Sequence, residues 1–137
     1  MNVGEKIDPE YEKWFQIVYD AREDARQFIQ ARLDAGEKVR GYEVDRRLKE
    51  RFEQLGCAQY LMHRTGHNIG HRCHGIGANL DDYETHDDRC LLPGTMFSIE
   101  PGLHTDKYGV RLEYDVHITS EGETKVYGPV QDEILVI

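Results

Sequence analysis

Apolar side chains recur every three or four residues between residues 9 and 35, which predicts one long amphipathic helix. Asp8 is a suitable N-cap, Pro9 suits the first helical turn, and Gly36 follows as a stop signal. The apolar stripe consists of Trp14, Ile17, Val18, Ala21, Ala25, Phe28, Ile29 and Leu33. Glutamate and arginine fill the opposite face, so we expect the stripe to pack against the rest of the protein.

A second, shorter helix is predicted over residues 42–55. Its apolar positions have helical spacing, and Gly56 is placed to end it. These positions are Val44, Leu48, Phe52 and Leu55. The two helices are therefore expected to form an antiparallel hairpin, roughly residues 9–55, that covers another part of the chain.

Residues 57–137 lack this helical period and are predicted to hold the sheet and the site motifs. A glycine-rich segment at 57–80 and an acidic surface loop at 81–90 precede the strands. Strands are expected at 95–100, 109–119, 125–127 and 133–137. In the second of these, five apolar residues alternate with polar ones, as in a half-buried strand: Val110, Leu112, Tyr114, Val116 and Ile118. Helices followed by strands predict an α+β fold.

Composition narrows the class of protein. The 137 residues, with a mass of 15.9 kDa, suit one domain over residues 1–137. A net charge of −9 argues against nucleic acid and anionic membranes as partners, since both bind clustered Lys and Arg. No apolar run is long enough to span a membrane, and the first residues do not resemble a signal peptide. Three cysteines without CxxC spacing suggest a reducing, cytoplasmic location.

Four of the seven histidines lie within twelve residues: His63, His67, His71 and His74. Glycines interrupt this stretch, which favours a strand followed by a loop over a helix. A glycine-rich backbone lets imidazoles approach a common centre, where they can bind a transition metal or carry protons. The alternative is that these histidines are exposed on the surface or packed in the core and have no shared function.

Two carboxylates lie in the apolar strand regions. Glu100 lies at the end of a predicted apolar strand, in Phe-Ser-Ile-Glu-Pro-Gly, and Glu113 lies within Gly-Val-Arg-Leu-Glu-Tyr-Asp-Val. A buried carboxylate needs a cation or a metal partner, and two on neighbouring strands can bridge metal ions. Alternatively, Glu113 lies on the solvent face and pairs with Arg111.

Three separated motifs together carry a family resemblance. The segments His-Arg-Thr-Gly-His at 63–67, Ser-Ile-Glu-Pro-Gly at 98–102 and Gly-Val-Arg-Leu-Glu at 109–113 occur in this order. The chain resembles the pita-bread metallopeptidases, which include methionine aminopeptidase, aminopeptidase P, prolidase and creatinase. The Glu-Pro-Gly and Gly-Val-Arg-x-Glu elements are most similar to the aminopeptidase P and prolidase branch. The resemblance implies part of that fold, with a helix hairpin packed on a curved antiparallel sheet.

The resemblance also implies roles for individual residues. His67, Glu100 and Glu113 match metal ligands, and Glu100 is also assigned as a catalytic proton shuttle. His63 and His74 match the histidines that bind the substrate and stabilise the tetrahedral intermediate, and Arg111 would support nearby carboxylates. The implied cofactor is one or two divalent ions of Mn, Co, Zn or Fe. His71 is treated as a bystander.

One departure from the family pattern concerns the remaining ligands. The family site has two further aspartate ligands on a β-hairpin that precedes the long helix, and Asn2–Lys6 resembles the stretch just after that hairpin. Asp34 and Asp45 have a similar separation but flank the turn between the predicted helices, so their spacing is treated as a coincidence. The acidic residues of the 81–90 loop match no ligand.

The sequence leaves three hypotheses about function. The first is a metallopeptidase that hydrolyses short peptides at the N-terminal residue, of the Xaa-Pro type, with one metal or with a partner chain that supplies aspartates. The second is an inactive half-domain that binds a peptide or a protein partner. The third is a fragment whose function belongs to a longer parent. The family fold has two similar halves around a curved sheet, and without the strands of the first half a sheet edge and an apolar face are left open. A homodimer is therefore expected, in which a second copy covers them.

Overall fold

Helix α1 spans Pro9–Asp34 in the computed structural model, which describes residues 6–136. The side chain of Asp8 caps it by accepting a hydrogen bond of 2.9 Å from the backbone N–H of Glu10. After the helix, Gly36 has a φ of 70°, a conformation that glycine adopts without steric cost. The first predicted helix and both of its end signals are therefore confirmed.

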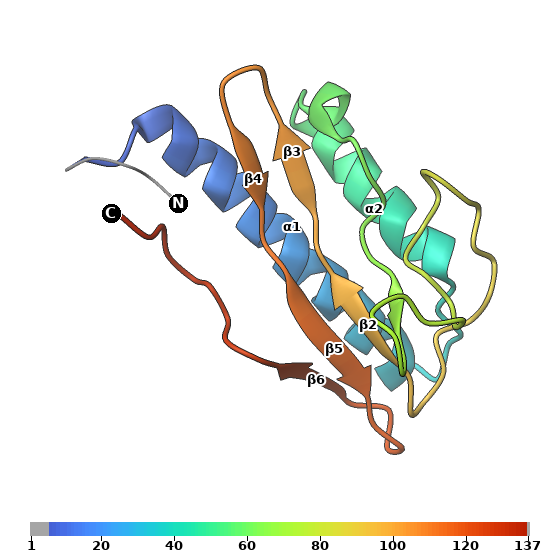
Figure 1. Ribbon diagram of the computed structural model, residues 1–137. Coiled ribbons are helices and arrows are strands. Elements are labelled where there is room, and N and C mark those ends of the chain that lie inside the picture. The colour runs from blue at the N-terminus through green and yellow to red at the C-terminus, as the bar shows by residue number, and fades with distance from the viewer. Residues whose placement is uncertain (1–5, 137) are drawn as a thin grey trace.

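Helix α2 spans Gly41–Gln54 and confirms the second predicted helix, with both ends shifted by one residue. The backbone N–H of Arg40 donates to the Glu43 carboxylate at 2.7 Å, which fixes the first turn. Val44, Leu48 and Phe52 are fully buried. The two helices run in opposite directions on the same side of the strands (Figure 1).

The strands form an antiparallel sheet of order β1-β2-β5-β6 and a separate two-stranded ribbon, β3-β4. After the short 3₁₀ helix Ala58–Tyr60, the strands are β1 Asn68–Ile69, β2 Met96–Ile99, β3 Gly102–His104, β4 Gly109–Arg111, β5 Tyr114–Ile118 and β6 Thr124–Tyr127. Helices on an antiparallel sheet confirm the predicted α+β class.

The strand expected at 109–119 is two strands, because the ladder is interrupted at Leu112 and Glu113. The register of β2 with β5 and that of β3 with β4 belong to one long hairpin. At the interruption, the register pairs Leu112 with Pro101, which has no N–H to donate, so this pair keeps only the bond from the Leu112 N–H to the Pro101 carbonyl, at 3.3 Å. The Glu100 N–H, like that of Ser98, points to the other neighbour and donates to the Thr65 carbonyl.

The alternation predicted along 109–119 is confirmed, since the five apolar side chains are buried. The strand followed by a loop that was expected at the histidine stretch is also confirmed, although the strand, β1, has two residues and is flanked by an isolated bridge between Gly66 and Leu80. The last predicted strand is not found. Residues 133–136 form no strand, and Ile137 lies outside the described residues. Among the residues described, no helix is long and apolar enough to cross a membrane.

Candidate metal centre

The interruption in the long hairpin places two carboxylates opposite each other. Glu100 follows β2 and Glu113 precedes β5, and the register of the flanking strands pairs their positions across the gap. Glu113 keeps the alternation of its strand and is exposed between the buried Leu112 and Tyr114. Glu100 is partly exposed, whereas residues 97–99 before it are buried.

A segment that runs antiparallel to β2 brings His67 to these carboxylates. The Ser98 N–H donates to the His67 carbonyl at 2.9 Å, and the His67 N–H donates to Ser98 Oγ at 3.0 Å. The Glu100 N–H donates to the Thr65 carbonyl at 2.8 Å. These bonds hold the His67 ring, which is buried, with Nε2 at 3.3 Å from Glu100 Oε1.

Ligand atoms of His67, Glu100 and Glu113 all lie within 4.8 Å of one another. The imidazole is buried, the first carboxylate is partly exposed and the second is exposed, so the group opens to solvent on one side. One imidazole and two carboxylates form a donor set that suits Zn²⁺, Mn²⁺, Co²⁺ or Fe²⁺. The residues present therefore fit a divalent metal ion.

The two carboxylates of the group have different electrostatic surroundings. The pKa of Glu113 is raised, mainly by burial of its carboxyl and further by the nearby carboxylates of Glu100 and Asp115. Arg111 places its guanidinium 3.6 Å from Glu100 Oε2, and its side chain is 45% exposed. The structure thus places Arg111 beside a carboxylate of the group, and its ion pair in the described chain is with Glu100 rather than Glu113.

The structure separates the two histidines expected to bind substrate. His74 lies on the exposed loop after β1, and its ring centroid is 4.3 Å from that of His67. His63 instead faces His104, with ring centroids 5.6 Å apart. His63 Nδ1 is 2.7 Å from the Arg64 carbonyl oxygen, while Nε2 is buried without a hydrogen-bond partner among the described residues. His71 is exposed and belongs to neither pair.

His104 is a neighbour of the site that the sequence did not single out as functional. Its pKa is lowered by burial, then by the adjacent His63 and Arg111. The sequence signal that could have pointed to His104 is its position just after the Glu-Pro-Gly motif.

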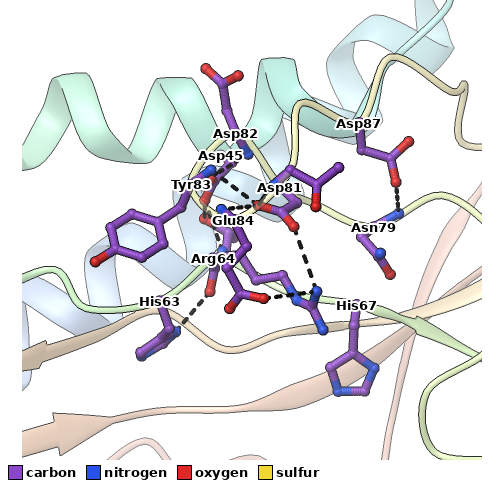
Figure 2. Close-up of polar contacts among 12 residues, drawn as sticks. Asp45, His63, Arg64, His67, Asn79, Asp81, Asp82, Tyr83, Glu84 and Asp87 are labelled. Carbon is purple, nitrogen blue, oxygen red and sulfur yellow. Dashed lines mark hydrogen bonds and ion pairs between the residues drawn. The ribbon is translucent and has the colours of Figure 1, made fainter.

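Asp45 is a buried positioning residue whose spacing to Asp34 looked coincidental in the sequence. One carboxylate oxygen accepts from the Thr65 N–H at 2.8 Å and from the Thr65 hydroxyl at 2.6 Å. The other accepts from the Asp82 N–H at 2.7 Å (Figure 2). Since the carbonyl of Thr65 accepts from Glu100, Asp45 fixes the backbone that carries two members of the group.

The acidic segment at 81–90 is a largely exposed loop, as expected, but two of its aspartates, Asp81 and Asp87, are buried. Asp81 is fully buried and accepts backbone N–H bonds of 2.8–3.1 Å from three consecutive residues, Tyr83 to Thr85. Its second oxygen lies 3.5 Å from Arg64, which also contacts Glu84. Short Asp side chains that bond to the following backbone are typical of turns, and this was the signal available in the sequence. Figure 2 shows His67 projecting away from this network.

The fold and the site define a class of protein, and comparison with known proteins assigns it. Residues 1–120 match the model of metallopeptidase family M24, so the chain belongs to that family. This confirms the family resemblance carried by the three motifs.

Curated relatives carry related names. The chain is 31% identical over 120 residues to a putative dipeptidase, YkvY, of Bacillus subtilis, a match that covers 85% of this chain and 30% of the relative. It is 34% identical over 90 residues to a probable dipeptidase, PepE, of Mycobacterium tuberculosis, covering 64% and 23% respectively. The chain thus spans less than a third of the length of these relatives.

Solved structures confirm the partial pita-bread fold. A dipeptidase from Pyrococcus horikoshii superposes with a TM-score of 0.80 at 28% identity, covering 98% of this chain and 35% of that one. An X-Pro aminopeptidase from Thermotoga maritima gives a TM-score of 0.80 at 26% identity, with the same coverage.

Proposed function

We propose that this chain supplies one histidine and two glutamate ligands to the divalent-metal centre of a peptidase that cleaves short peptides at the N-terminal residue. The observation that carries the proposal is the convergence of His67, Glu100 and Glu113 at the opening of the hairpin. Membership of family M24 supports the same chemistry.

The three ligands would hold one or two ions of Mn, Co, Zn or Fe. When bound, such an ion lowers the pKa of water and polarises a carbonyl oxygen. Glu100, whose Oε1 lies beside His67 and Oε2 beside Arg111, would accept the proton of the attacking water and return it to the leaving amine. Arg111 would keep this carboxylate in position.

The histidines outside the ligand group would bind the substrate. His63 Nε2 is a buried ring nitrogen without a hydrogen-bond partner in the described chain, so a substrate oxygen that reached it would satisfy its hydrogen bonding. His74 lies against the His67 ring on the exposed side of the group, where a peptide would enter. Both would stabilise charge that develops on the scissile carbonyl.

The proposed substrates are short Xaa-Pro peptides. Support comes from an Xaa-Pro dipeptidase of Lactobacillus helveticus, which is 30% identical over 110 residues. We further propose a cytoplasmic protein that forms a homodimer through an open sheet edge, β1 or β6. Sedimentation at micromolar concentration tests the dimer, and a strictly monomeric profile would contradict it.

Hydrolysis by the Mn²⁺-loaded or Co²⁺-loaded chain tests the catalytic proposal. We expect release of the N-terminal residue from an Xaa-Pro dipeptide, faster than from the matched Xaa-Ala dipeptide, and loss of turnover in Glu100→Gln. His71→Ala is the matched control, because His71 is exposed and lies outside the group. Metal and peptide binding without turnover would favour an inactive half-domain that binds peptides, the second hypothesis raised by the sequence.

A further inference from the structure

A second group of potential metal ligands also includes His67. Ligand atoms of His67, Cys73 and His74 all lie within 4.8 Å of one another. Cys73 and His74 are exposed, whereas His67 is buried. The five candidate ligands form two groups that share His67, rather than one group of five. The second group contains a thiol and a second imidazole in place of the two carboxylates.

The loop that carries Cys73 and His74 is fixed by hydrogen bonds to Asn68, the residue next to His67. The Gly75 N–H donates to the Asn68 carbonyl at 2.7 Å, and the Gly77 N–H donates to Asn68 Oδ1 at 3.0 Å. Gly75 packs so closely that a Cβ there would lie 2.1 Å from Asn68 Oδ1, so any side chain would displace the Asn68 amide or the loop. The Asn68 amide is itself anchored, donating to the Met96 carbonyl at 3.0 Å.

This anchoring makes the second group a property of the folded loop. The loop returns over β1, and the His74 ring comes to 4.3 Å from the His67 ring, at an interplanar angle of 59°. Tilted rings at this separation can direct nitrogen atoms toward a common point. Cys73 is the residue before His74, so the same turn brings its sulfur to that point.

We propose that His67, Cys73 and His74 form an alternative position for a soft divalent ion, with Zn²⁺ as the ion of choice. Two imidazoles, one thiolate and a water complete a tetrahedral set of a kind that zinc accepts. Thiolate favours Zn²⁺, whereas carboxylates favour Mn²⁺, so the two groups select different metals. On binding, Cys73 loses its thiol proton to solvent and the Sγ–metal bond forms, without any change of oxidation state.

Because His67 belongs to both groups, its ring selects between them. Zn²⁺ held by the loop would occupy the imidazole that the carboxylate group also needs, and His74 would become a ligand instead of a substrate-binding residue. Zn²⁺ at this position would therefore compete with Mn²⁺ at the proposed catalytic centre. The alternative position rests on that proposal, because the two positions share His67.

Absorption spectra of the full chain titrated with Co²⁺ test the proposal, under a reductant that does not bind metals. A cobalt–thiolate bond gives a near-ultraviolet charge-transfer band that oxygen and nitrogen ligands do not give. We expect the band in wild-type protein and in Cys90→Ser, and its complete loss in Cys73→Ser. Cys73 is exposed, so the serine variant should fold, and circular dichroism checks this. Zn²⁺ affinity should fall at least about tenfold in Cys73→Ser, because even the loss of a residue that only supports a metal ligand lowers metal affinity by that factor.

A paired histidine comparison makes the assignment specific. His74→Ala should weaken the band and Zn²⁺ binding, and His71→Ala, three residues earlier on the same loop, should not. A wild-type protein that binds Co²⁺ without the band would overturn the proposal, as would a band that survives Cys73→Ser. Glu100→Gln separates this result from the peptidase proposal, because that variant should lose turnover while keeping the cobalt–thiolate band.

Discussion

The helical hairpin and the loops around the metal group are held in place by different interactions. Helices α1 and α2 bury apolar residues that meet other apolar residues, such as Val18 and Phe52. The loops are held by buried carboxylates that accept backbone N–H bonds. Asp81 and Asp87 lie in the loops themselves, and Asp45 reaches them from the polar side of α2. Apolar contacts are non-directional, whereas hydrogen bonds fix distance and angle. The helices should therefore determine how stable the protein is, and the loops should determine where the ligands lie.

The largest expected effect is on the helical side of this comparison. Phe52→Ala removes a fully buried ring from α2 and should lower the free energy of unfolding by about 3–5 kcal/mol. Denaturant titration measures the change. Leu55→Ala is the matched control on the next turn, where the side chain is 51% exposed and the cost should stay below about 0.5 kcal/mol. The Mn²⁺ affinity of the fraction that remains folded should be unchanged. A large loss of Mn²⁺ affinity would show that the helical core also determines where the ligands lie.

The next effect concerns the hydrogen bonds by which α2 holds the loops, and it should appear both in the free energy of unfolding and in Mn²⁺ affinity. Asp45→Ala leaves two backbone N–H groups and the Thr65 hydroxyl without their acceptor, at a cost of about 2–3 kcal/mol. Mn²⁺ affinity should also fall about tenfold, because Thr65 no longer holds the Glu100 backbone in place. Calorimetric titration with Mn²⁺ measures this second effect.

Asp24→Ala is the control for Asp45. Asp24 forms a two-point pair with Arg47 on the surface of the hairpin, at 2.7 and 2.8 Å. Its loss should cost less than about 1 kcal/mol and leave Mn²⁺ binding unchanged. Equal losses of Mn²⁺ affinity in the two variants would refute a positioning role for Asp45.

The same difference explains what could be predicted from the sequence. Helical spacing and end signals are local, so α1 and α2 were predicted with accurate boundaries. The alternation along 109–119 was also predicted, but the break in its hydrogen-bond ladder depends on Pro101, the residue that faces Leu112 from the other arm of the hairpin. Single-residue patterns do not report such a partner.

The candidate site divides in a similar way. The motifs that resemble the family pointed to His67, Glu100 and Glu113, and the structure brings these residues together. The role of Asp45 was missed because its partners lie 20 and 37 residues further along the chain. His104 and Cys73 approach the histidines through tertiary folding, which spacing alone does not reveal.

A third stability effect, smaller than those of Phe52 and Asp45, concerns a loop aspartate and depends on pH. Hydrogen bonds from the Arg89 side chain and from the backbone N–H groups of Asn79 and Arg89 lower the pKa of Asp87 to about 2, against 3.8 for the free side chain. The ionised form is thus favoured in the folded state. Its contribution is complete above pH 3.8 and is lost as the pH falls through about 2.

Asp87→Asn removes this contribution, which we estimate at about 1–2 kcal/mol because Arg89 is partly solvated. The variant should be less stable at neutral pH and should show a flatter decline in unfolding free energy between pH 4 and pH 2. Denaturant titrations at several pH values measure both. Parallel curves for the variant and the wild type would show that Asp87 does not stabilise the loop in this way.

Binding of Mn²⁺ to the full chain, measured by calorimetric titration, is the most direct test of the central claim that His67, Glu100 and Glu113 form a divalent-metal centre. Mn²⁺ prefers the carboxylate group over the thiolate group, so it isolates this centre. We expect saturable binding by the wild type, a loss of at least about tenfold in Glu100→Gln, and no change in Glu123→Gln, an exposed control. No Mn²⁺ binding by the wild type, or equal binding by both variants, would contradict the account.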